Sequence, residues 1–233
     1  ELLAQTEFDI AIFQTSAMDA KGQYSFAHSC DMPPVVWPMA ERRIAFVNEQ
    51  MRSLPCAESM PAEAVDLTIP INEPLLSPTS GGRRSAAVDK IAQLVAELVP
   101  DGATFQAGIG DTPAAIVSAL RLHRGLRVHS GIITQEYQQL AESGALDAAA
   151  EHVSGIAWGD AAFRSWLPQS GFVFRSVVKT HGHDELAAIP GFVSIGSALE
   201  VDLAGNLNLE WRAGRRVSSV GGAPDYLRAA AAS

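Results

Sequence analysis

Short apolar and β-branched runs alternate with alanine-rich stretches along this chain. Runs typical of strands cover residues 8–14, 43–48, 65–71, 104–107, 126–129, 153–157 and 172–177. Between them, the stretch from Ser85 to Leu98 has apolar residues at helical spacing and polar residues on the opposite face. Strands that alternate with amphipathic helices are typical of a parallel sheet covered by helices. The pattern therefore predicts an α/β fold.

One segment interrupts this alternation. Residues 72–84 concentrate proline, glycine and serine, which are typical of linkers between domains. We therefore expect a first domain over residues 1–78, a linker over 79–84 and a second domain over 85–233. The chain shows no internal repeat.

A glycine-rich turn follows the strand expected at 104–107. Gly108 and Gly110 permit a tight turn, and Thr112 with Pro113 reads as the cap and first residue of a helix. Such a turn directs backbone N–H groups and a helix N-terminus toward one point, which suits an anion or a developing oxyanion. A plain strand-to-helix turn is the commoner interpretation of the same pattern. Because proline ends it, the pattern is not the dinucleotide fingerprint.

Composition narrows the class of partner. The 233 residues include 26 acidic and 17 basic side chains, for a formal charge of −9. Long-range repulsion therefore disfavours a nucleic-acid partner, although a local basic pocket for a small phosphate is compatible with that charge. Neither a signal peptide nor an apolar run of membrane-spanning length occurs, so we expect no membrane insertion.

The two cysteines, Cys30 and Cys56, lack metal-binding spacing and favour a reducing, cytoplasmic setting. The chain lacks an initiator Met and opens almost directly into a strand. We therefore expect it to be a segment of a longer protein.

The C-terminal third contains a second small-residue loop. Residues 192–210 read as strands around a turn at Ala204-Gly205-Asn206, with Glu200 and Asp202 on one face. Two carboxylates on one face suit acid/base chemistry, but a solvated strand face explains them as well. After them, residues 218–225 form a glycine-containing loop that offers further N–H donors.

These segments together resemble the acetyl-CoA hydrolase and CoA-transferase family. The matching pieces occur in order and span nearly the whole chain: 9–14, 22–25, 47–51, 102–120, 194–210 and 220–226. The resemblance implies two α/β domains with open, mostly parallel sheets covered by helices. It also implies a CoA thioester bound between the domains, a small carboxylic acid as acceptor, and a homo-oligomer. The chain would cover only part of the usual family length.

The resemblance also implies a chemistry. A glutamate of that family attacks the acyl-CoA to form an acyl-glutamyl anhydride, then captures CoA as a glutamyl thioester. Backbone amides of two glycine loops stabilise the oxyanion. Carried over to this chain, those amides belong to Ile109 and Gly110 in the first loop and to Gly221 and Gly222 in the second. The CoA thioester enters as substrate, and neither a further cofactor nor a metal is expected.

The chain departs from the family at the nucleophile. Counted from His129 and Ser130, the glutamate position is Gly131, so no catalytic residue carries over. Glycine also replaces an expected asparagine at Gly196, and alanine replaces an expected glycine at Ala27. Loss of a nucleophile in a hydrolase removes roughly 10⁶ in turnover when nothing compensates. We expect a glutamate introduced at residue 131 to restore exchange if the rest of the site is intact.

Two carboxylates are candidates for compensation. Asp111 lies in the first glycine loop, and Glu136 lies at the start of a helix expected over 135–141. Each is also explained as an acid that complements a helix dipole, which is the commoner role.

Three further groups have both structural and functional interpretations. His129 ends an expected strand at the mouth of the cleft, where it would bind substrate or serve as a hydrogen-bonded structural residue. The run from His181 to Asp184 contains two histidines in an expected loop, without a matched Cys or Glu for a metal. Trp158, Phe163 and Trp166 are interpreted as core residues.

Three hypotheses follow for function. The first is a divergent CoA-transferase or acyl-CoA hydrolase whose carboxylate comes from elsewhere or is replaced by activated water. The second is a catalytically silent subunit or sensor that binds CoA esters. The third is an α/β domain with an unrelated ligand. Retention of both glycine loops favours the first two.

Overall fold

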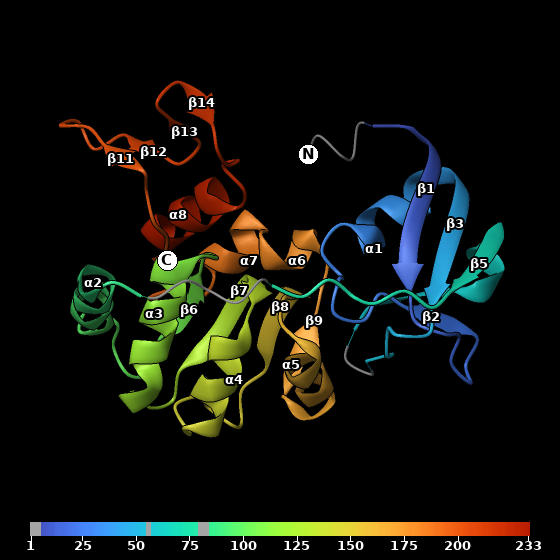
Figure 1. Ribbon diagram of the computed structural model, residues 1–233, viewed down its shortest axis with the longest axis horizontal. Coiled ribbons are helices and arrows are strands. Elements are labelled where there is room, and N and C mark those ends of the chain that lie inside the picture. The colour runs from blue at the N-terminus through green and yellow to red at the C-terminus, as the bar shows by residue number, and fades with distance from the viewer. Residues whose placement is uncertain (1–5, 55–56, 79–83) are drawn as a thin grey trace.

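The computed structural model describes residues 6–54, 57–78 and 84–233, and it has the α/β architecture that the sequence predicts (Figure 1). Two parallel sheets organise these residues. The smaller sheet lies in the N-terminal part, and the larger sheet with its helices lies in the C-terminal part (Figure 1).

The smaller sheet has the strand order β1-β3-β5, with both neighbouring pairs parallel. Its strands are β1 (Phe8–Thr15), β3 (Ala40–Asn48) and β5 (Leu67–Ile71). Side chains of β1 alternate, so Ala11 and Phe13 are buried while Ile10 and Ile12 are exposed. Helix α1 (Pro33–Val36) and the short antiparallel pair β2 (Gln23–Ser25) and β4 (Ser59–Pro61) lie beside this sheet.

The larger sheet has the strand order β10-β6-β7-β8-β9 and is parallel throughout. Its strands are β6 (Thr104–Ala107), β7 (Arg127–Ile133), β8 (His152–Ala157), β9 (Phe172–Phe174) and β10 (Val193–Ile195). Figure 1 shows three helices along one side of these strands: α3 (Asp111–Ala119), α4 (Gln135–Glu142) and α5 (Ala161–Trp166). Helix α2 (Ala86–Ala96) packs against α3.

A second group of helices lies above the strands in the view of Figure 1. It consists of α6 (Val177–Thr180), α7 (His183–Ala187) and the C-terminal α8 (Ala223–Ala232). Helix α6 contacts β7 and β8, and α7 contacts α8. Two small hairpins project beyond α8 (Figure 1), made of β11 (Glu200–Val201) with β12 (Leu207–Asn208) and of β13 (Trp211–Arg212) with β14 (Arg215–Arg216).

Main-chain hydrogen bonds join the N-terminal part to the larger sheet. Cys30 N donates to Gly155 O at 2.9 Å, and Ala157 N donates to His28 O at 2.9 Å. Further along, Ser176 N donates to the Glu58 carboxylate at 2.8 Å. The expected domain boundaries remain a prediction, and most of the expected linker, together with Cys56, lies outside the described residues.

The core is continuous across both parts and is rich in aromatic rings. Phe105 stacks on Tyr137 at 5.9 Å, and Phe172 meets both Tyr137 and Trp166 edge to face. Phe163 is fully buried, as the sequence predicts. Trp158 is 39% exposed, so its assignment to the core was wrong: β8 ends at Ala157, and the following chain turns toward the surface.

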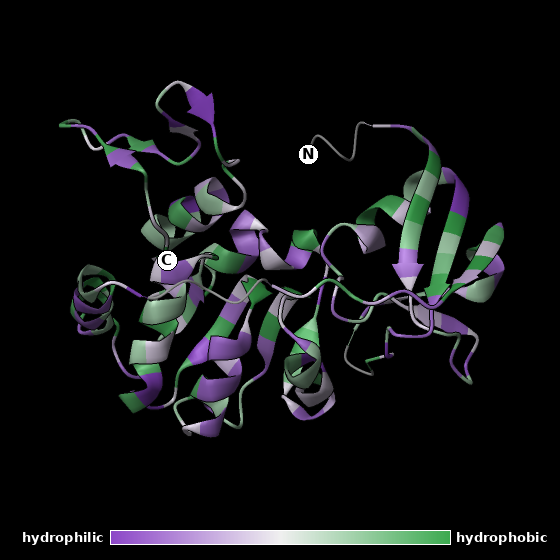
Figure 2. Cartoon of the chain, in the orientation of Figure 1, coloured by the Kyte–Doolittle hydropathy of each residue, from purple (hydrophilic) through white to green (hydrophobic). Residues whose placement is uncertain are grey.

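Hydropathy follows this arrangement. In Figure 2 the strands of the larger sheet are mainly hydrophobic, whereas α4 turns a mainly hydrophilic surface outward. Among the described residues, no helix has both the length and the apolar character needed to cross a membrane.

Two strands end three or more residues away from the end that the sequence predicts. Strand β7 continues to Ile133 instead of ending at His129, and it passes through Gly131. Strand β9 ends at Phe174, three residues earlier than expected, because Ser176 precedes the first turn of α6. The first difference places Gly131 inside the sheet.

Candidate functional site

Gly131 lies against two side chains that come from other elements. A Cβ atom at this position would stand 2.6 Å from His181 Cε1, 2.9 Å from His181 Nε2 and 2.9 Å from the Tyr226 hydroxyl. Real Cβ atoms essentially never approach a neighbour within 3.0 Å. The space that a nucleophilic side chain would enter is therefore filled by an imidazole and a phenol.

The second glycine loop meets the same imidazole. Gly222 is the N-cap of α8, and a Cβ there would collide with the ring of His181. Gly221 has φ +55°, a left-handed conformation that favours glycine. Two of the positions singled out from sequence, Gly131 and Gly222, thus converge on one side chain that sequence reasoning had considered only for metal binding.

Local contacts fix the ring of His181. His181 is the C-cap of α6, and α7 begins at His183, so the loop that the sequence suggested over His181 to Asp184 is confined to His181 and Gly182. The His181 Nδ1 lies 2.8 Å from the Thr180 hydroxyl, and its ring centroid lies 4.7 Å from that of Tyr226. Burial lowers the pKa of His181, and the nearby Asp31 and Asp225 carboxylates act in the opposite direction. The ring is therefore neutral near pH 7.

Asp31 brings a carboxylate to this cluster. Its Oδ1 atom is buried without a hydrogen-bond partner in the part of the chain that the structure describes. Burial raises the pKa of Asp31, and His181 opposes that shift. Its backbone carbonyl accepts from Val177 N at 2.7 Å, which ties it to α6. Sequence reasoning missed this residue because nothing in the local pattern around it signals a contact with residues 150 positions away.

The first glycine loop is tied to a different neighbour. Gly108 N donates to Ile195 O on β10 at 3.0 Å, and Gly110, with φ +114°, is the N-cap of α3. Ile109 is 64% exposed. A Cβ at Gly196, beside this strand end, would meet nothing within 4 Å. Convergence of Ile109 and Gly110 with Gly221 and Gly222 on one oxyanion stays a prediction.

The two carboxylates considered as replacements occupy helix N-termini. Asp111 is the first residue of α3, and Glu136, in the first turn of α4, accepts from the Thr134 hydroxyl at 2.6 Å. Both positions fit the interpretation that an acid complements the helix dipole. Glu200 accepts from the Asn208 amide, and Asp202 accepts from Ala204 N and Asn206 N of the predicted turn.

Of the two other histidines considered from the sequence, one has a structural contact. His129 lies within β7 and not at its end, and its Nε2 lies 2.9 Å from the Lys179 carbonyl. Burial lowers the pKa of His129. His183 is exposed at the start of α7. Within residues 6–54, 57–78 and 84–233, no group of three or more His, Cys, Asp or Glu side chains is placed to hold a metal ion.

At Ala27 the chain differs from the expected glycine in its side chain and not in its backbone conformation. The residue is fully buried with φ +50°, a left-handed conformation that favours glycine. The backbone at the expected glycine position therefore keeps a geometry that suits glycine.

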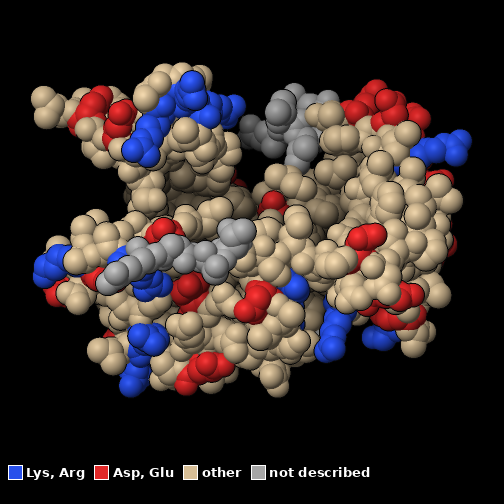
Figure 3. Space-filling model, in the orientation of Figure 1, with Lys and Arg blue, Asp and Glu red and all other residues tan. Residues whose placement is uncertain are grey.

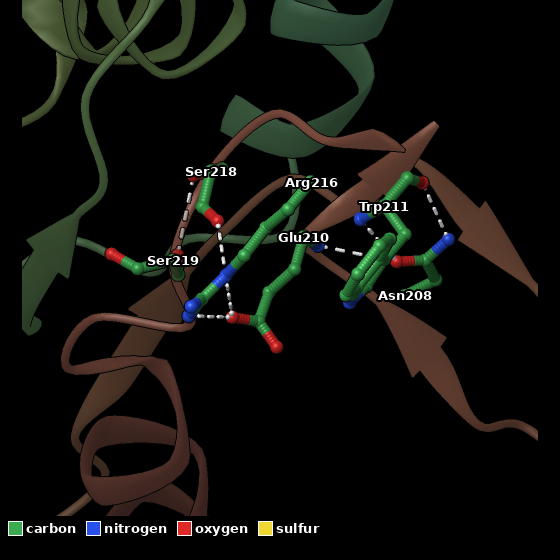
Figure 4. Close-up of polar contacts among 6 residues, drawn as sticks. All are labelled: Asn208, Glu210, Trp211, Arg216, Ser218 and Ser219. Carbon is green, nitrogen blue, oxygen red and sulfur yellow. Dashed lines mark hydrogen bonds and ion pairs between the residues drawn. The ribbon is translucent and has the colours of Figure 1, made fainter. Parts of the chain in front are cut away.

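The C-terminal hairpins lead the chain into the second glycine loop. Figure 4 shows Arg216 pointing toward Glu210, with a 2.5 Å contact between Nη2 and Oε1, while Arg216 Nε donates to Ser218 O at 3.1 Å. The Asn208 side chain binds the backbone of Trp211: its Oδ1 accepts from Trp211 N, and its Nδ2 donates to Trp211 O. These bonds fix the exit of the hairpin a few residues before Gly221.

The hairpins also carry positive charge. Figure 3 shows basic side chains gathered on this lobe and a hollow in the surface beneath it. Arg212, Arg215 and Arg216 belong to β13 and β14. The same lobe also carries Glu200, Asp202 and Glu210, and Glu210 pairs with Arg216, so Arg212 and Arg215 supply the positive charge that suits a phosphate-bearing ligand.

Comparison with known proteins confirms the resemblance seen in the motifs. Residues 159–233 match the family model described as the acetyl-CoA hydrolase/transferase C-terminal domain. The chain is 27% identical to butyryl-CoA:acetate CoA-transferase of Anaerostipes caccae over 95% of its length. It is 30% identical to a probable butyrate:acetyl-CoA coenzyme A-transferase of Syntrophomonas wolfei, again over 95% of its length.

Solved structures show the same relationship. The crystal structure of a 4-hydroxybutyrate CoA-transferase from Porphyromonas gingivalis superimposes with a TM-score of 0.86, at 26% identity and over all of this chain. The chain covers 52% of each of the two curated relatives and 58% of that crystal structure's chain. It therefore spans about half the length of the proteins it matches.

Proposed function

We propose, from its confirmed resemblance to the acetyl-CoA hydrolase and CoA-transferase family, that this protein acts on acyl-CoA thioesters as a divergent CoA-transferase or acyl-CoA hydrolase. One observation carries the proposal: Gly222 of the second glycine loop and Gly131, the position to which the resemblance assigns the nucleophile, both face the ring of His181. In this proposal the loop assigned to the oxyanion therefore lies near the position assigned to the nucleophile, and Gly131 carries no nucleophilic side chain.

The substrate class is consistent with the charge distribution. An acyl-CoA carries several phosphate charges, and the arginines of β13 and β14 supply positive charge on the lobe above the surface hollow. The thioester is the substrate in this proposal, and no other cofactor is required. In transfer a small carboxylic acid accepts CoA, and in hydrolysis water accepts the acyl group. The relatives named above also lead us to propose a homo-oligomer that works in the cytoplasm.

A second candidate is a catalytically silent subunit or sensor that binds CoA esters. The loss of the glutamate side chain at Gly131 favours it, because transfer through an acyl-glutamyl anhydride needs a carboxylate that is both nucleophile and leaving group. Under this hypothesis the protein keeps the fold and the binding surface but turns over nothing.

Two measurements on the purified full-length protein separate these candidates. Calorimetric titration with acetyl-CoA and butyryl-CoA reports binding, and chromatography of the CoA species after incubation of butyryl-CoA with and without acetate reports turnover. Binding with release of free CoA or with formation of acetyl-CoA supports an enzyme, whereas binding with neither product supports the silent subunit. Failure of both CoA esters to bind would refute both candidates.

A chemical trap tests the mechanism. Mixing the protein with acyl-CoA and then with borohydride or hydroxylamine should yield no covalent glutamyl-CoA adduct. An adduct on any residue would show that a carboxylate elsewhere replaces the missing glutamate.

A further inference from the structure

The imidazole of His181 occupies the position from which a nucleophile would act. Its Nε2 atom lies 2.9 Å from the point where a Cβ of residue 131 would stand, and it lies even closer to the corresponding point of Gly222. The side chain is only partly buried, so solvent can reach it. A basic nitrogen thus faces the strand position and the glycine loop at once.

Hydrogen bonding around the ring indicates which nitrogen holds the proton. The Thr180 hydroxyl lies 2.8 Å from Nδ1 and donates to the Ser176 carbonyl at 3.4 Å. A hydroxyl that donates its one proton to this carbonyl can accept from Nδ1–H, and the proposal below takes this tautomer. Among the described residues, His181 Nε2 has no hydrogen-bond partner. The Nε2 lone pair is therefore free to accept a proton.

The charged neighbours favour a base at this position. Burial has the largest effect on His181 and lowers its pKa, and His129 acts in the same direction, whereas Asp31 and Asp225 both act to stabilise the imidazolium form. The Asp31 Oδ1 atom is buried without a partner among the described residues. A buried carboxylate oxygen near an imidazole compensates the positive charge that appears when the ring takes a proton.

We propose that His181 is a catalytic general base that activates water for hydrolysis of the acyl-CoA thioester, with Thr180 as a positioning residue. This inference rests on the proposed function and deepens it, because it selects hydrolysis over transfer to a carboxylic acid.

The reaction balances without a covalent intermediate. As His181 Nε2 takes a proton from water, the water oxygen forms a bond to the thioester carbonyl carbon, and the carbonyl π pair moves to oxygen. Backbone amides of the second glycine loop stabilise that oxyanion. Collapse of the tetrahedral intermediate breaks the C–S bond, and the imidazolium returns its proton to the departing CoA thiolate. The products are CoA thiol and the carboxylic acid, which ionises in solution.

The decisive variant is His181→Asn in the full-length protein, with His183→Asn as its matched control. His183 is two residues away and exposed, outside the cluster around Gly131. Acetyl-CoA hydrolysis is followed by thiol release, and binding is followed by titration with an acetyl-CoA analogue that has methylene in place of the thioester sulfur. We expect His181→Asn to lower kcat about 10²–10⁴-fold with little change in analogue binding. His183→Asn should match the wild type.

A spectroscopic readout keeps the test independent of folding of the variants. Long-range ¹H–¹⁵N spectra of the wild-type protein distinguish the two neutral tautomers, and we expect the Nδ1–H form for His181. Thr180→Val should populate the other tautomer and lower kcat by a smaller factor than His181→Asn. If His181→Asn does not fold, His181→Gln provides the same comparison.

Several outcomes overturn the inference. They are an Nε2–H tautomer in the wild type, hydrolysis by His181→Asn at the wild-type rate, and wild-type transfer to acetate without hydrolysis. The last two leave the proposed function intact, because CoA esters are still processed. Absence of both analogue binding and hydrolysis in the wild type overturns the proposed function together with the inference.

Discussion

A methyl group added at Gly131 tests the packing at the centre of the site. The Cβ of Gly131→Ala would stand 2.6 Å from one carbon of the His181 ring and 2.9 Å from both His181 Nε2 and the Tyr226 hydroxyl. Gly131 does not have a left-handed φ, so its substitution adds crowding without backbone strain. Overpacking of this kind costs about 1–3 kcal/mol. We therefore expect Gly131→Ala to lower the free energy of unfolding by that amount.

Denaturant unfolding measures the change, and Gly196→Ala is the matched control. A Cβ at Gly196 meets nothing within 4 Å, and its φ is not left-handed, so we expect the control to be neutral or stabilised by up to about 1 kcal/mol. Removing the ring in a Gly131→Ala/His181→Ala double variant should recover part of the loss, with a coupling of about 0.5–3 kcal/mol. Equal stability of Gly131→Ala and Gly196→Ala would refute this description of the site.

The same crowding changes the expectation for a restored nucleophile. A glutamate at residue 131 has to displace His181 before its carboxylate can reach a substrate. We therefore expect Gly131→Glu alone to show less acetate-dependent exchange than Gly131→Glu/His181→Ala. Higher exchange in the single variant would show that the imidazole moves aside readily.

Three further variants probe other parts of the molecule. Burial, with a smaller effect of Arg164, lowers the pKa of His28 to about 4. As the pH falls from 6.5 to 4, His28 therefore takes up a proton in the unfolded chain before it does so in the folded chain. The stability that neutral His28 contributes is present above pH 6.5 and is lost as the pH falls. Between pH 7 and 5, the free energy of unfolding should therefore fall by about 2 kcal/mol more in the wild type than in His28→Asn. An equal fall in both proteins would contradict the lowered pKa of His28. Gly159→Ala would drive a Cβ into the buried ring of Phe163 and should cost about 1–3 kcal/mol in denaturant unfolding, whereas a neutral result would show that the ring shifts freely. Arg212→Glu together with Arg215→Glu should weaken acetyl-CoA binding and reduce its salt dependence in titrations, and binding as tight as that of the wild type would place the CoA phosphates elsewhere.

Local pattern was sufficient for most of the secondary structure. The strand at Thr104–Ala107 begins and ends where it was expected, and the amphipathic stretch from Ser85 becomes helix α2 because its apolar residues recur at helical spacing. The family resemblance also came from local motifs and is confirmed. Errors occurred where neighbours outside the local sequence decide, as at β7, whose pairing with β8 carries the strand through Gly131 to Ile133.

In the candidate site, too, short motifs predicted some residues and only the packing of distant elements determined the others. The sequence alone predicted that Gly131 lacks the family's nucleophile and that Gly222 belongs to an amide-lined loop, since both depend on matching short motifs. Only the tertiary structure brought His181, from the C-cap of α6, and Tyr226, from α8, to these glycines, and Asp31, from the segment before α1, to His181. The reason is physical: spacing along the chain determines which residues share a helix face or strand edge, whereas packing of distant elements determines which side chain fills the space that a glycine leaves.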